Sequence, residues 1–193
     1  MNRTPRVAAV HDLSGLGRCS LSVILPVLSV MGIQCCPLPT AFLSTHTGGF
    51  EGFTFLDMTD EMPKVSAHWK QLGLRFQAIY SGFLGSERQI GIVEDFIRDF
   101  RTPDTLVVVD PVMGDHGRVY QTYTPAMCAG TAHLAARADV ITPNLTEAAL
   151  LLEEKEEDLE LGEGCVVSRG ASVKRSVLWD GARMDDGAHA RGC

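Results

Sequence analysis

The sequence predicts an α/β protein with a doubly wound, mostly parallel sheet in residues 1–152, joined to a short hexapeptide-repeat, β-helix-like tail. Three observations lead to this prediction. Short apolar runs alternate with longer segments of helical spacing, which is typical of parallel sheets. Small polar loops directly follow several of the apolar runs. Beyond residue 160 the hydrophobic period changes to six, which is typical of a parallel β-helix.

The first strand is predicted at residues 6–11, an apolar run that ends at the tight loop 12–15. A helix is predicted over residues 19–31 because its apolar residues recur at helical spacing. Pro26 should kink this helix, since proline removes an internal hydrogen bond. Gly32 supplies the residue that commonly ends a helix.

The rest of the first domain repeats this alternation. Residues 105–110 are the clearest strand, because a run that is apolar throughout indicates a strand covered on both faces. Ser86 has the short hydroxyl side chain preferred at a helix N-cap, and Gly73 is a helix stop. The other predicted elements are strands at 33–38, 78–81 and 139–142, and helices at 60–72, 86–100, 124–136 and 146–154.

The chain changes character after the last of these helices. Residues 153–160 are an acidic run, which we interpret as a solvated linker. Residues 161–193 then repeat every six positions, although a chance period in a tail rich in glycine and alanine remains an alternative. The repeating columns are Leu161, Val167, Val173 and Trp179; Val166, Ser172, Leu178, Met184 and Ala190; and Gly164, Gly170, Ser176, Ala182 and Ala188.

The composition excludes several classes of function. The net charge is −7 and no lysine or arginine cluster offsets it, which argues against a nucleic-acid partner. No apolar stretch has the length of a membrane span, and residues 1–6 lack the apolar core of a signal peptide. The six cysteines have no CxxC spacing and are predicted to be reduced. A cytoplasmic protein with no membrane partner is therefore expected.

Polar loops at the ends of predicted strands are the first functional signal. Ligands of doubly wound sheets bind beyond the carboxyl ends of the strands. Four such loops follow strands directly, at residues 11–15, 81–82, 110–115 and 142–144. We therefore expect a small-molecule site at this edge of the sheet.

The acidic residues of these loops allow two interpretations each. Asp110 could hold Mg²⁺, which binds through one or two carboxylates with phosphates and waters, or it could cap the turn before Pro111. Asn144 and Glu147 could contact metal and nucleotide phosphate at a helix N-terminus, or could simply cap that helix, with Thr146 as another N-cap candidate. Both readings can hold for the same residues.

The first loop is better suited to a polar ligand than to phosphate. Residues 15–18 are too short for a phosphate-binding glycine loop, so Asp12 and Ser14 are predicted to hydrogen-bond a small polar molecule. Residues 44–49 are either a loop that folds over a ligand or a turn. His11 and His46 lack metal-ligand spacing and are predicted to be structural or hydrogen-bonding.

Together these loops resemble the pyridoxal kinase family of the ribokinase-like superfamily, in particular its bacterial pyridoxamine kinase-like branch. The resemblance covers about residues 6–152 and rests on motifs that occur in the family's order. They are AAVHDLSG at 8–15, LSTHTG at 43–48, IYSGFLGS at 79–86, VDPVMGD at 109–115 and VITPNLTE at 140–147.

The resemblance implies phosphorylation of the 5′-hydroxymethyl group of a vitamin B6 vitamer with ATP and Mg²⁺, in pyridoxal 5′-phosphate salvage. The residues implied to contact the vitamer are Asp12, Ser14, Thr47 and Tyr80. Those implied to bind ATP are Asp110, Thr142, Asn144 and Glu147, with Asp110 and Glu147 as metal ligands. Phosphoryl transfer depends mainly on positioning and charge neutralisation, which suits these side chains.

One expected motif departs from the pattern. Members of this family carry a late Gly-x-Gly-Asp motif whose aspartate is the general base, and the nearest string here is GEGC at 162–165. The resemblance therefore implies a C-terminally truncated domain with no assigned catalytic residue and doubtful turnover. The tail resembles the hexapeptide β-helix of sugar-nucleotide nucleotidyltransferases, with SVLWDGA at 176–182 as its most similar phrase.

Two further hypotheses stay open from the sequence. The chain could be a non-catalytic vitamer-binding or assembly module, in which the tail drives formation of a homo-oligomer. It could also be a fusion of two gene fragments, because the hydrophobic period changes abruptly near residue 160.

Overall fold

The computed structural model forms two compact units, Met1–Val107 and Val108–Cys193. No helix in the part of the chain that it describes is long and apolar enough to cross a membrane. The described residues are 4–47, 50–120, 122–153, 160–161, 166–168, 172–174, 177–178, 183–184, 187 and 189–191.

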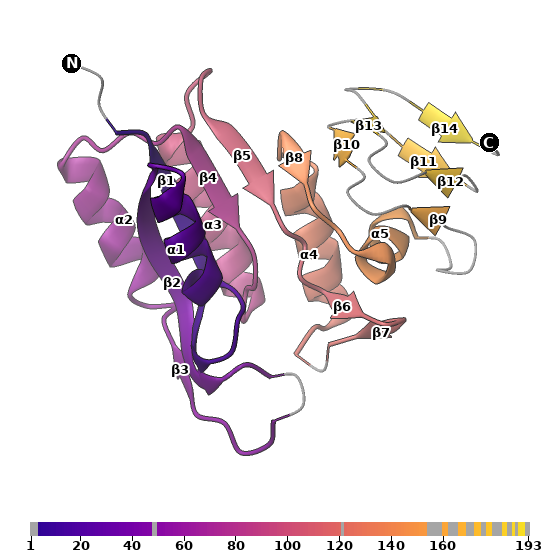
Figure 1. Cartoon of the computed structure of the whole chain (residues 1–193), viewed down its shortest axis with the longest axis horizontal. Coiled ribbons are helices and arrows are strands. Elements are labelled where there is room, and N and C mark those ends of the chain that lie inside the picture. The colour runs from indigo at the N-terminus through magenta and orange to yellow at the C-terminus, as the bar shows by residue number, and fades with distance from the viewer. Residues whose placement is uncertain are drawn as a thin grey trace. The chain divides into compact units, whose positions relative to one another are not determined.

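The sheet of Met1–Val107 is mostly parallel, as predicted (Figure 1). Strand β1 (Arg6–Leu16) lies between β2 (Gln34–Thr45) and β4 (Ala78–Ser81) and is parallel to both. Strand β3 (Phe55–Asp57) continues this sheet antiparallel to β2. The hydrogen-bonded order is therefore β4-β1-β2-β3.

Three helices cover the two faces of this sheet. Helix α1 (Leu21–Val30) contains Pro26 and packs on β1 and β2. Helices α2 (Met62–Gln71) and α3 (Glu87–Phe100) contact each other. Right-handed crossovers place α1 on one face and α2 and α3 on the other. The aromatic core beside α2 and α3 consists of Trp69, Phe76, Phe96 and Phe100, with ring centroids 4.5–6.1 Å apart.

Helix α3 shows how local sequence and packing agree. Its predicted N-cap is confirmed, because the Ser86 side chain accepts a hydrogen bond from the Gln89 amide. Its inward face buries residues at helical spacing, among them Ile90, Val93 and Phe96. Burying an apolar side chain of this size stabilises a fold by about 1.5–3 kcal/mol. This packing fixes the direction in which the N-terminus of α3 points.

Strand β2 is longer than predicted, and so is β1. Strand β2 contains Pro37 and Pro39, neither of which can donate a backbone hydrogen bond to a neighbouring strand. The Gln34 amide donates to the Pro5 carbonyl, so even-numbered amides near the start of β2 face β1. The two prolines therefore face the other edge, and there β3 begins to pair only at Ala41. No ladder bond is lost at either proline.

Strand β5 (Leu106–Val109) begins in the first unit and ends in the second. In Val108–Cys193 it pairs in parallel with β8 (Val140–Ile141). Helices α4 (Pro125–Ala135) and α5 (Leu145–Leu152) belong to the same unit. A short antiparallel hairpin that was not predicted, β6 (Gly114–Asp115) with β7 (Arg118–Val119), follows β5. Its turn has positive φ at His116 and Gly117, which suits a tight reversal.

Short strands recur along the described part of the tail. They pair in parallel as β9 with β12, β10 with β13, and β11 with β14, and each pair joins residues 17 positions apart. Strand β10 also pairs antiparallel with β8. Most of the predicted acidic linker and many positions of the hexad columns lie outside the described residues. The strands are β9 (Glu160–Leu161), β10 (Val166–Ser168), β11 (Ser172–Lys174), β12 (Val177–Leu178), β13 (Arg183–Met184) and β14 (His189–Arg191).

Candidate functional site

Asp12 lies at an irregularity in the first unit's sheet. The register between β1 and β2 shifts between His11 and Leu13, where a bulge can redirect a side chain. Asp12 is buried, and its carboxylate accepts hydrogen bonds from the hydroxyls of Ser14 and Ser20. The structure therefore brings the predicted Asp12 and Ser14 together. Ser20, which precedes α1, was missed because its sequence position suggested only the start of a helix.

His11, in the middle of β1, is packed against Tyr80 near the carboxyl end of β4. Their ring centroids are 4.4 Å apart in an edge-on arrangement. Burial lowers the pKa of His11 to about 3, and a hydrogen bond with the Tyr80 backbone opposes this shift only in part. The imidazole is therefore neutral at physiological pH. This agrees with the prediction that His11 is structural or hydrogen-bonding.

Gly82 allows the histidine ring to lie where it does. A Cβ atom at Gly82 would lie 2.2 Å from His11 Nδ1, far inside van der Waals contact. The SGFLG segment after β4 thus needs glycine at this position for a packing reason. Tyr80 is half-buried beside it.

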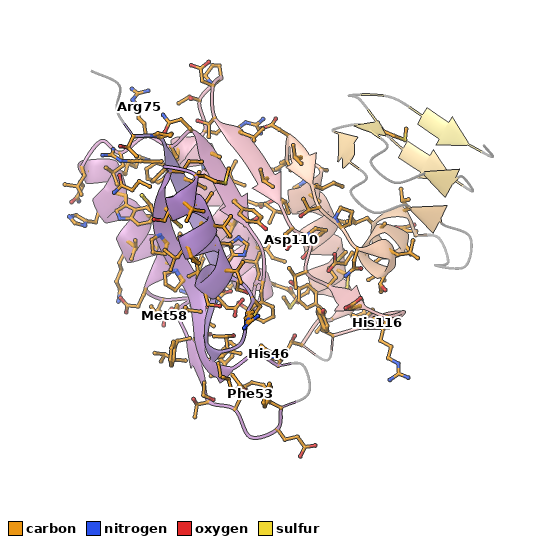
Figure 2. All side chains as sticks on the ribbon, viewed as in Figure 1. His46, Phe53, Met58, Arg75, Asp110 and His116 are labelled. Carbon is orange, nitrogen blue, oxygen red and sulfur yellow. The ribbon has the colours of Figure 1, made fainter. Side chains whose placement is uncertain are left out.

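Thr47 lies outside the sheet. It is exposed in the connection between β2 and β3, just after Thr45 ends β2. The base of this connection is bound to the sheet, because the His46 amide donates to the Leu16 carbonyl and Ser44 and Thr54 exchange hydrogen bonds. Residues 44–45 are thus strand rather than loop. Figure 2 shows His46 and Phe53 in this region.

Asp110 follows β5 in the second unit, near the β6–β7 hairpin that carries His116 (Figure 2). Burial raises the pKa of Asp110 to about 6, against the effect of a hydrogen bond from the Thr142 side chain. The Thr142 amide donates to the Val109 carbonyl, 3.2 Å away, which ties the ends of β5 and β8 together. Asp110 and Thr142 are therefore neighbours in the structure.

Asn144 and Glu147 form a capping box at the start of α5. Asn144 Oδ1 accepts from the Glu147 amide at 2.9 Å, and Glu147 Oε2 accepts from the Asn144 amide at 2.9 Å. Asn144 Nδ2 also donates to the Gly114 carbonyl. The N-cap candidate Thr146 is corrected: it lies inside α5, and its hydroxyl accepts from the Gly117 amide instead.

Glu147 is a buried carboxylate with unusual electrostatics. Its pKa is raised to about 7, mainly by burial and also by the nearby charge of Asp110, against the effect of hydrogen bonds from backbone amides. One of these comes from the Met113 amide to Oε1 at 3.2 Å. Tyr120, which was not singled out from the sequence, lies near the same charges. Burial raises its pKa most, and the charges of Asp115, Glu147 and Asp110 raise it further.

The Asp110–Glu147 pair fits a hard cation such as Mg²⁺. Glu147 is buried and Asp110 half-buried, and two such carboxylates are stabilised when a cation shares them. Oxygen ligands are those that Mg²⁺ prefers. Within the described ranges no group of three or more acidic, histidine or cysteine side chains could hold a metal. Phosphate and water oxygens would therefore have to complete the coordination, as is usual for Mg²⁺ bound with a nucleotide.

A parallel α/β sheet with hydroxyl and carboxylate side chains at its strand ends defines the general class, an α/β protein that binds small ligands at the edge of its sheet. The chain belongs to the phosphomethylpyrimidine kinase family, which includes the pyridoxal kinases, because the profile of this family matches residues 25–190. The predicted family is thereby confirmed.

Relatives with known names support this placement. The pyridoxal kinase PdxY of Vibrio vulnificus is 31% identical over 140 residues, which cover 68% of this chain and 47% of that protein. A candidate phosphomethylpyrimidine kinase from Bacteroides thetaiotaomicron, crystallised with pyridoxal, is 59% identical with a TM-score of 0.77, over 80% of this chain and 54% of that one. The pyridoxal kinase of Lactobacillus plantarum is 38% identical, with a TM-score of 0.73, over 78% of this chain and 53% of that one. The chain thus spans about half the length of these relatives.

Proposed function

We propose that this chain binds a vitamin B6 vitamer and the Mg²⁺ complex of ATP, and so forms the substrate-binding part of a pyridoxal kinase. The observation that carries the proposal is the placement of the five family motifs on parallel strands: the motif at 8–15 lies inside β1, and the other four cross the carboxyl ends of β2, β4, β5 and β8. The 59%-identical relative was crystallised with pyridoxal, which favours a pyridine ligand.

The first unit supplies the vitamer contacts in this proposal. The carboxylate of Asp12 would accept a hydrogen bond from an O–H or N–H donor of the vitamer, with Ser14 and Thr47 binding polar substituents and Tyr80 lining the ring. Asp12 is supported by two hydroxyl donors, so it is already oriented before a ligand arrives. Such preorganisation lowers the entropic cost of binding.

The second unit supplies the nucleotide side. Asp110 and Glu147 would hold Mg²⁺, and Thr142 and Asn144 would contact the nucleotide phosphates beside the N-terminus of α5. Bound Mg²⁺ neutralises phosphate charge during phosphoryl transfer. Because burial raises the pKa of both carboxyl groups and the charge of Asp110 also raises that of Glu147, cation binding should release protons near neutral pH.

The Gly-x-Gly-Asp motif does not occur in residues 1–193, so we propose that this chain alone turns over slowly. Loss of a general base typically lowers a rate by about 10²–10⁴-fold. A partner chain that supplied the aspartate would restore the rate. The alternative is a vitamer-binding or assembly module that has no kinase activity.

A coupled kinase assay with ATP and Mg²⁺ tests this proposal. Pyridoxal, pyridoxamine and hydroxymethylpyrimidine are offered to the wild type and to Asp110→Ala, with pyridoxal binding followed in parallel. Slow turnover of a pyridoxal-type substrate that is lost in Asp110→Ala supports the kinase assignment. Pyridoxal binding without turnover supports the binding module. Absence of pyridoxal binding by the folded protein contradicts the proposal, and turnover of hydroxymethylpyrimidine alone reassigns the substrate.

We further propose that the tail forms a hexapeptide β-helix. Its support is the common 17-residue offset of the three parallel pairs, close to the length of three hexads. Met184 is buried, at 8% exposure, and would point into this helix. Met184→Asp should increase amide exchange in all three pairs together, and an effect confined to β13 would contradict the proposal. Size-exclusion chromatography of both proteins tests whether the tail drives self-association.

A further inference from the structure

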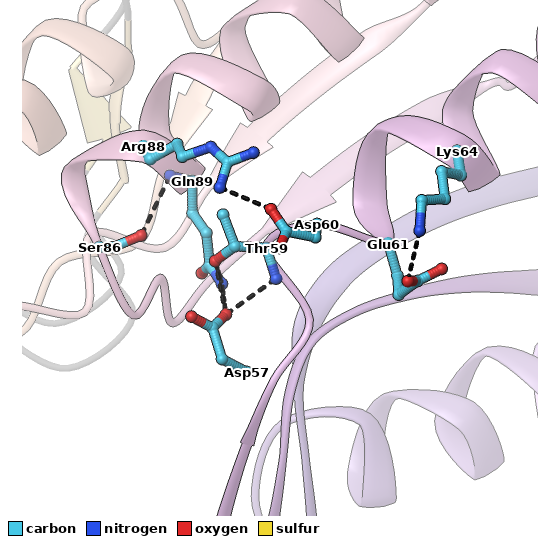
Figure 3. Close-up of polar contacts among 8 residues, drawn as sticks. All are labelled: Asp57, Thr59, Asp60, Glu61, Lys64, Ser86, Arg88 and Gln89. Carbon is cyan, nitrogen blue, oxygen red and sulfur yellow. Dashed lines mark hydrogen bonds and ion pairs between the residues drawn. The ribbon is translucent and has the colours of Figure 1, made fainter.

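Gln89 is a fully buried polar side chain in the first turn of α3, with 0% exposure. Its amide group makes hydrogen bonds at both its oxygen and its nitrogen, although none of the sequence motifs that define the site includes it. Such a residue is expensive to bury unless every bond is made. Figure 3 shows it beside polar residues of the stretch 57–64.

The donor end of Gln89 holds the base of the β2–β3 hairpin. Its Nε2 atom donates to the Thr40 carbonyl at 2.9 Å, on β2. It also lies 3.2 Å from Oδ1 of Asp57, the last residue of β3, and 2.9 Å from Oγ1 of Thr59, just beyond that strand. The Thr59 amide and hydroxyl both donate to Asp57, which completes the group (Figure 3). Both strands of the hairpin are therefore fastened to one side chain.

The acceptor end of Gln89 holds the segment that follows Tyr80. The Gly85 amide donates to Gln89 Oε1 at 2.7 Å. On the same segment the Phe83 carbonyl accepts from Thr40 Oγ1 at 2.9 Å. Gln89 thus lies between the hairpin that carries Thr47 and the loop that continues from Tyr80.

We propose that Gln89 is a positioning residue, which sets the placement of the Thr47 hairpin relative to Tyr80 and thereby the affinity for the vitamer. The choice of ligand in this inference rests on the proposed function. The claim that Gln89 places the hairpin relative to Tyr80 rests on the hydrogen bonds alone. A side chain with one acceptor and one donor end can join the two segments, and glutamate cannot, because an ionised carboxylate has no donor.

The variant Gln89→Glu tests the donor end with almost no change in shape. It keeps the bond from the Gly85 amide, loses the bonds to Thr40 and Thr59, and places a second carboxylate beside Asp57. The charged groups around it are Asp57, Arg88 and Asp60, the last two forming an exposed pair. We expect pyridoxal to bind about tenfold more weakly at pH 8, a free-energy difference of about 1.4 kcal/mol. Lower pH, which protonates the new carboxyl, should restore the affinity relative to the wild type at the same pH.

Amide hydrogen exchange tests, without any ligand, whether Gln89 holds the β2–β3 hairpin in place. The Ser44 amide, which is bonded to the Thr54 carbonyl, should exchange faster in Gln89→Glu at pH 8. The Gly82 amide, which is bonded to the Val10 carbonyl within the sheet, should be unchanged. This pattern distinguishes local opening of the hairpin from global unfolding. The double variant Gln89→Glu/Asp57→Asn should recover part of the loss, because it removes the carboxylate that faces the new charge.

Gln71→Glu is the matched control, since Gln71 is an exposed residue of α2. It should alter neither hairpin exchange nor pyridoxal affinity. Equal exchange at Ser44 and Gly82 in Gln89→Glu, or an affinity loss that does not respond to pH, would overturn the inference. Failure of the wild type to bind pyridoxal would reject the proposed function instead, and the exchange measurement would still decide whether Gln89 holds the hairpin.

Discussion

The candidate site residues of the two units differ in what determines their arrangement and charge. In Met1–Val107, Asp12 is held by two hydroxyls, and His11 is buried as a neutral ring against Tyr80. In Val108–Cys193, Asp110 and Glu147 are two acidic groups whose pKa values are raised by burial. Packing and hydrogen bonds determine the arrangement of the first group, whereas the cost of burying negative charge determines the protonation of the second. A neutral ligand suits the first, and a cation suits the second.

The two groups also give stability an opposite pH dependence. His11 has a folded pKa of about 3, below its usual 6.5, so the unfolded chain takes up the proton first and stability is lost as pH falls below 6.5. Asp110 and Glu147 have raised values of about 6 and 7, so the unfolded chain loses protons first. Their contribution is present at low pH and is lost as pH rises toward 7.

Gly82→Ala should give the largest loss of stability. The added Cβ would meet His11 Nδ1 at 2.2 Å, and overpacking of this kind costs about 1–3 kcal/mol. Urea denaturation measures the change in the free energy of unfolding. Gly91→Ala in α3 is the control, because no atom lies within 4 Å of its added Cβ and alanine favours a helix. Similar losses in both variants would show that packing at His11 is not the cause.

Asn144→Ala should be the next largest change. It removes the bonds to the Glu147 amide and to the Gly114 carbonyl, and an N-cap loss costs about 0.5–2 kcal/mol. Thr146→Val should cost less, since the exposed Gly117 amide can bond to water instead. Thermal denaturation of both variants checks the order. A greater cost at Thr146 would mean that the capping box is not what stabilises α5.

Asp110→Asn should stabilise the ligand-free protein at pH 8 by about 0.5–2 kcal/mol, because it removes repulsion with Glu147. Its unfolding free energy should decline less between pH 4 and 8 than that of the wild type. The loss at acidic pH, which arises from His11, should remain. Stabilisation by Mg²⁺ with ATP should disappear. Denaturation between pH 4 and 8 measures the effects on stability, and its repetition with Mg²⁺ and ATP measures the effect of the ligand. Asp104→Asn, at an exposed aspartate, is the control.

Arg88→Ala should have the smallest effect, about 0–0.5 kcal/mol, although its ion pair with Asp60 lies beside Gln89 in Figure 3. The two side chains are 64% and 76% exposed, so water and salt weaken the pair. Urea denaturation at low and high salt should show little difference. A larger loss would mean that the network at the hairpin base extends to the surface.

Much of the fold could be predicted because hydrophobic periodicity is a local property. The strand at 78–81 and the helix capped by Ser86 agree with the structure. Strand β3 and the β6–β7 hairpin could not be predicted, since each is only two or three residues long and exists through pairing with a distant or adjacent strand. The extension of β2 over residues 39–45 could not be predicted either, because it depends on which edge of the strand its prolines face.

The sequence by itself determined the alternation of strands and helices, the family and the polar motifs that carry Asp12, Asp110 and Glu147, because these follow from local patterns and short motifs. Only the tertiary structure decided how those residues behave. Burial makes His11 neutral and raises the Asp110 and Glu147 pKa values, and no local pattern specifies burial. Gln89 is the clearest case, because its four partners lie on β2, at β3 and on the loop after β4, and the fold alone brings them together.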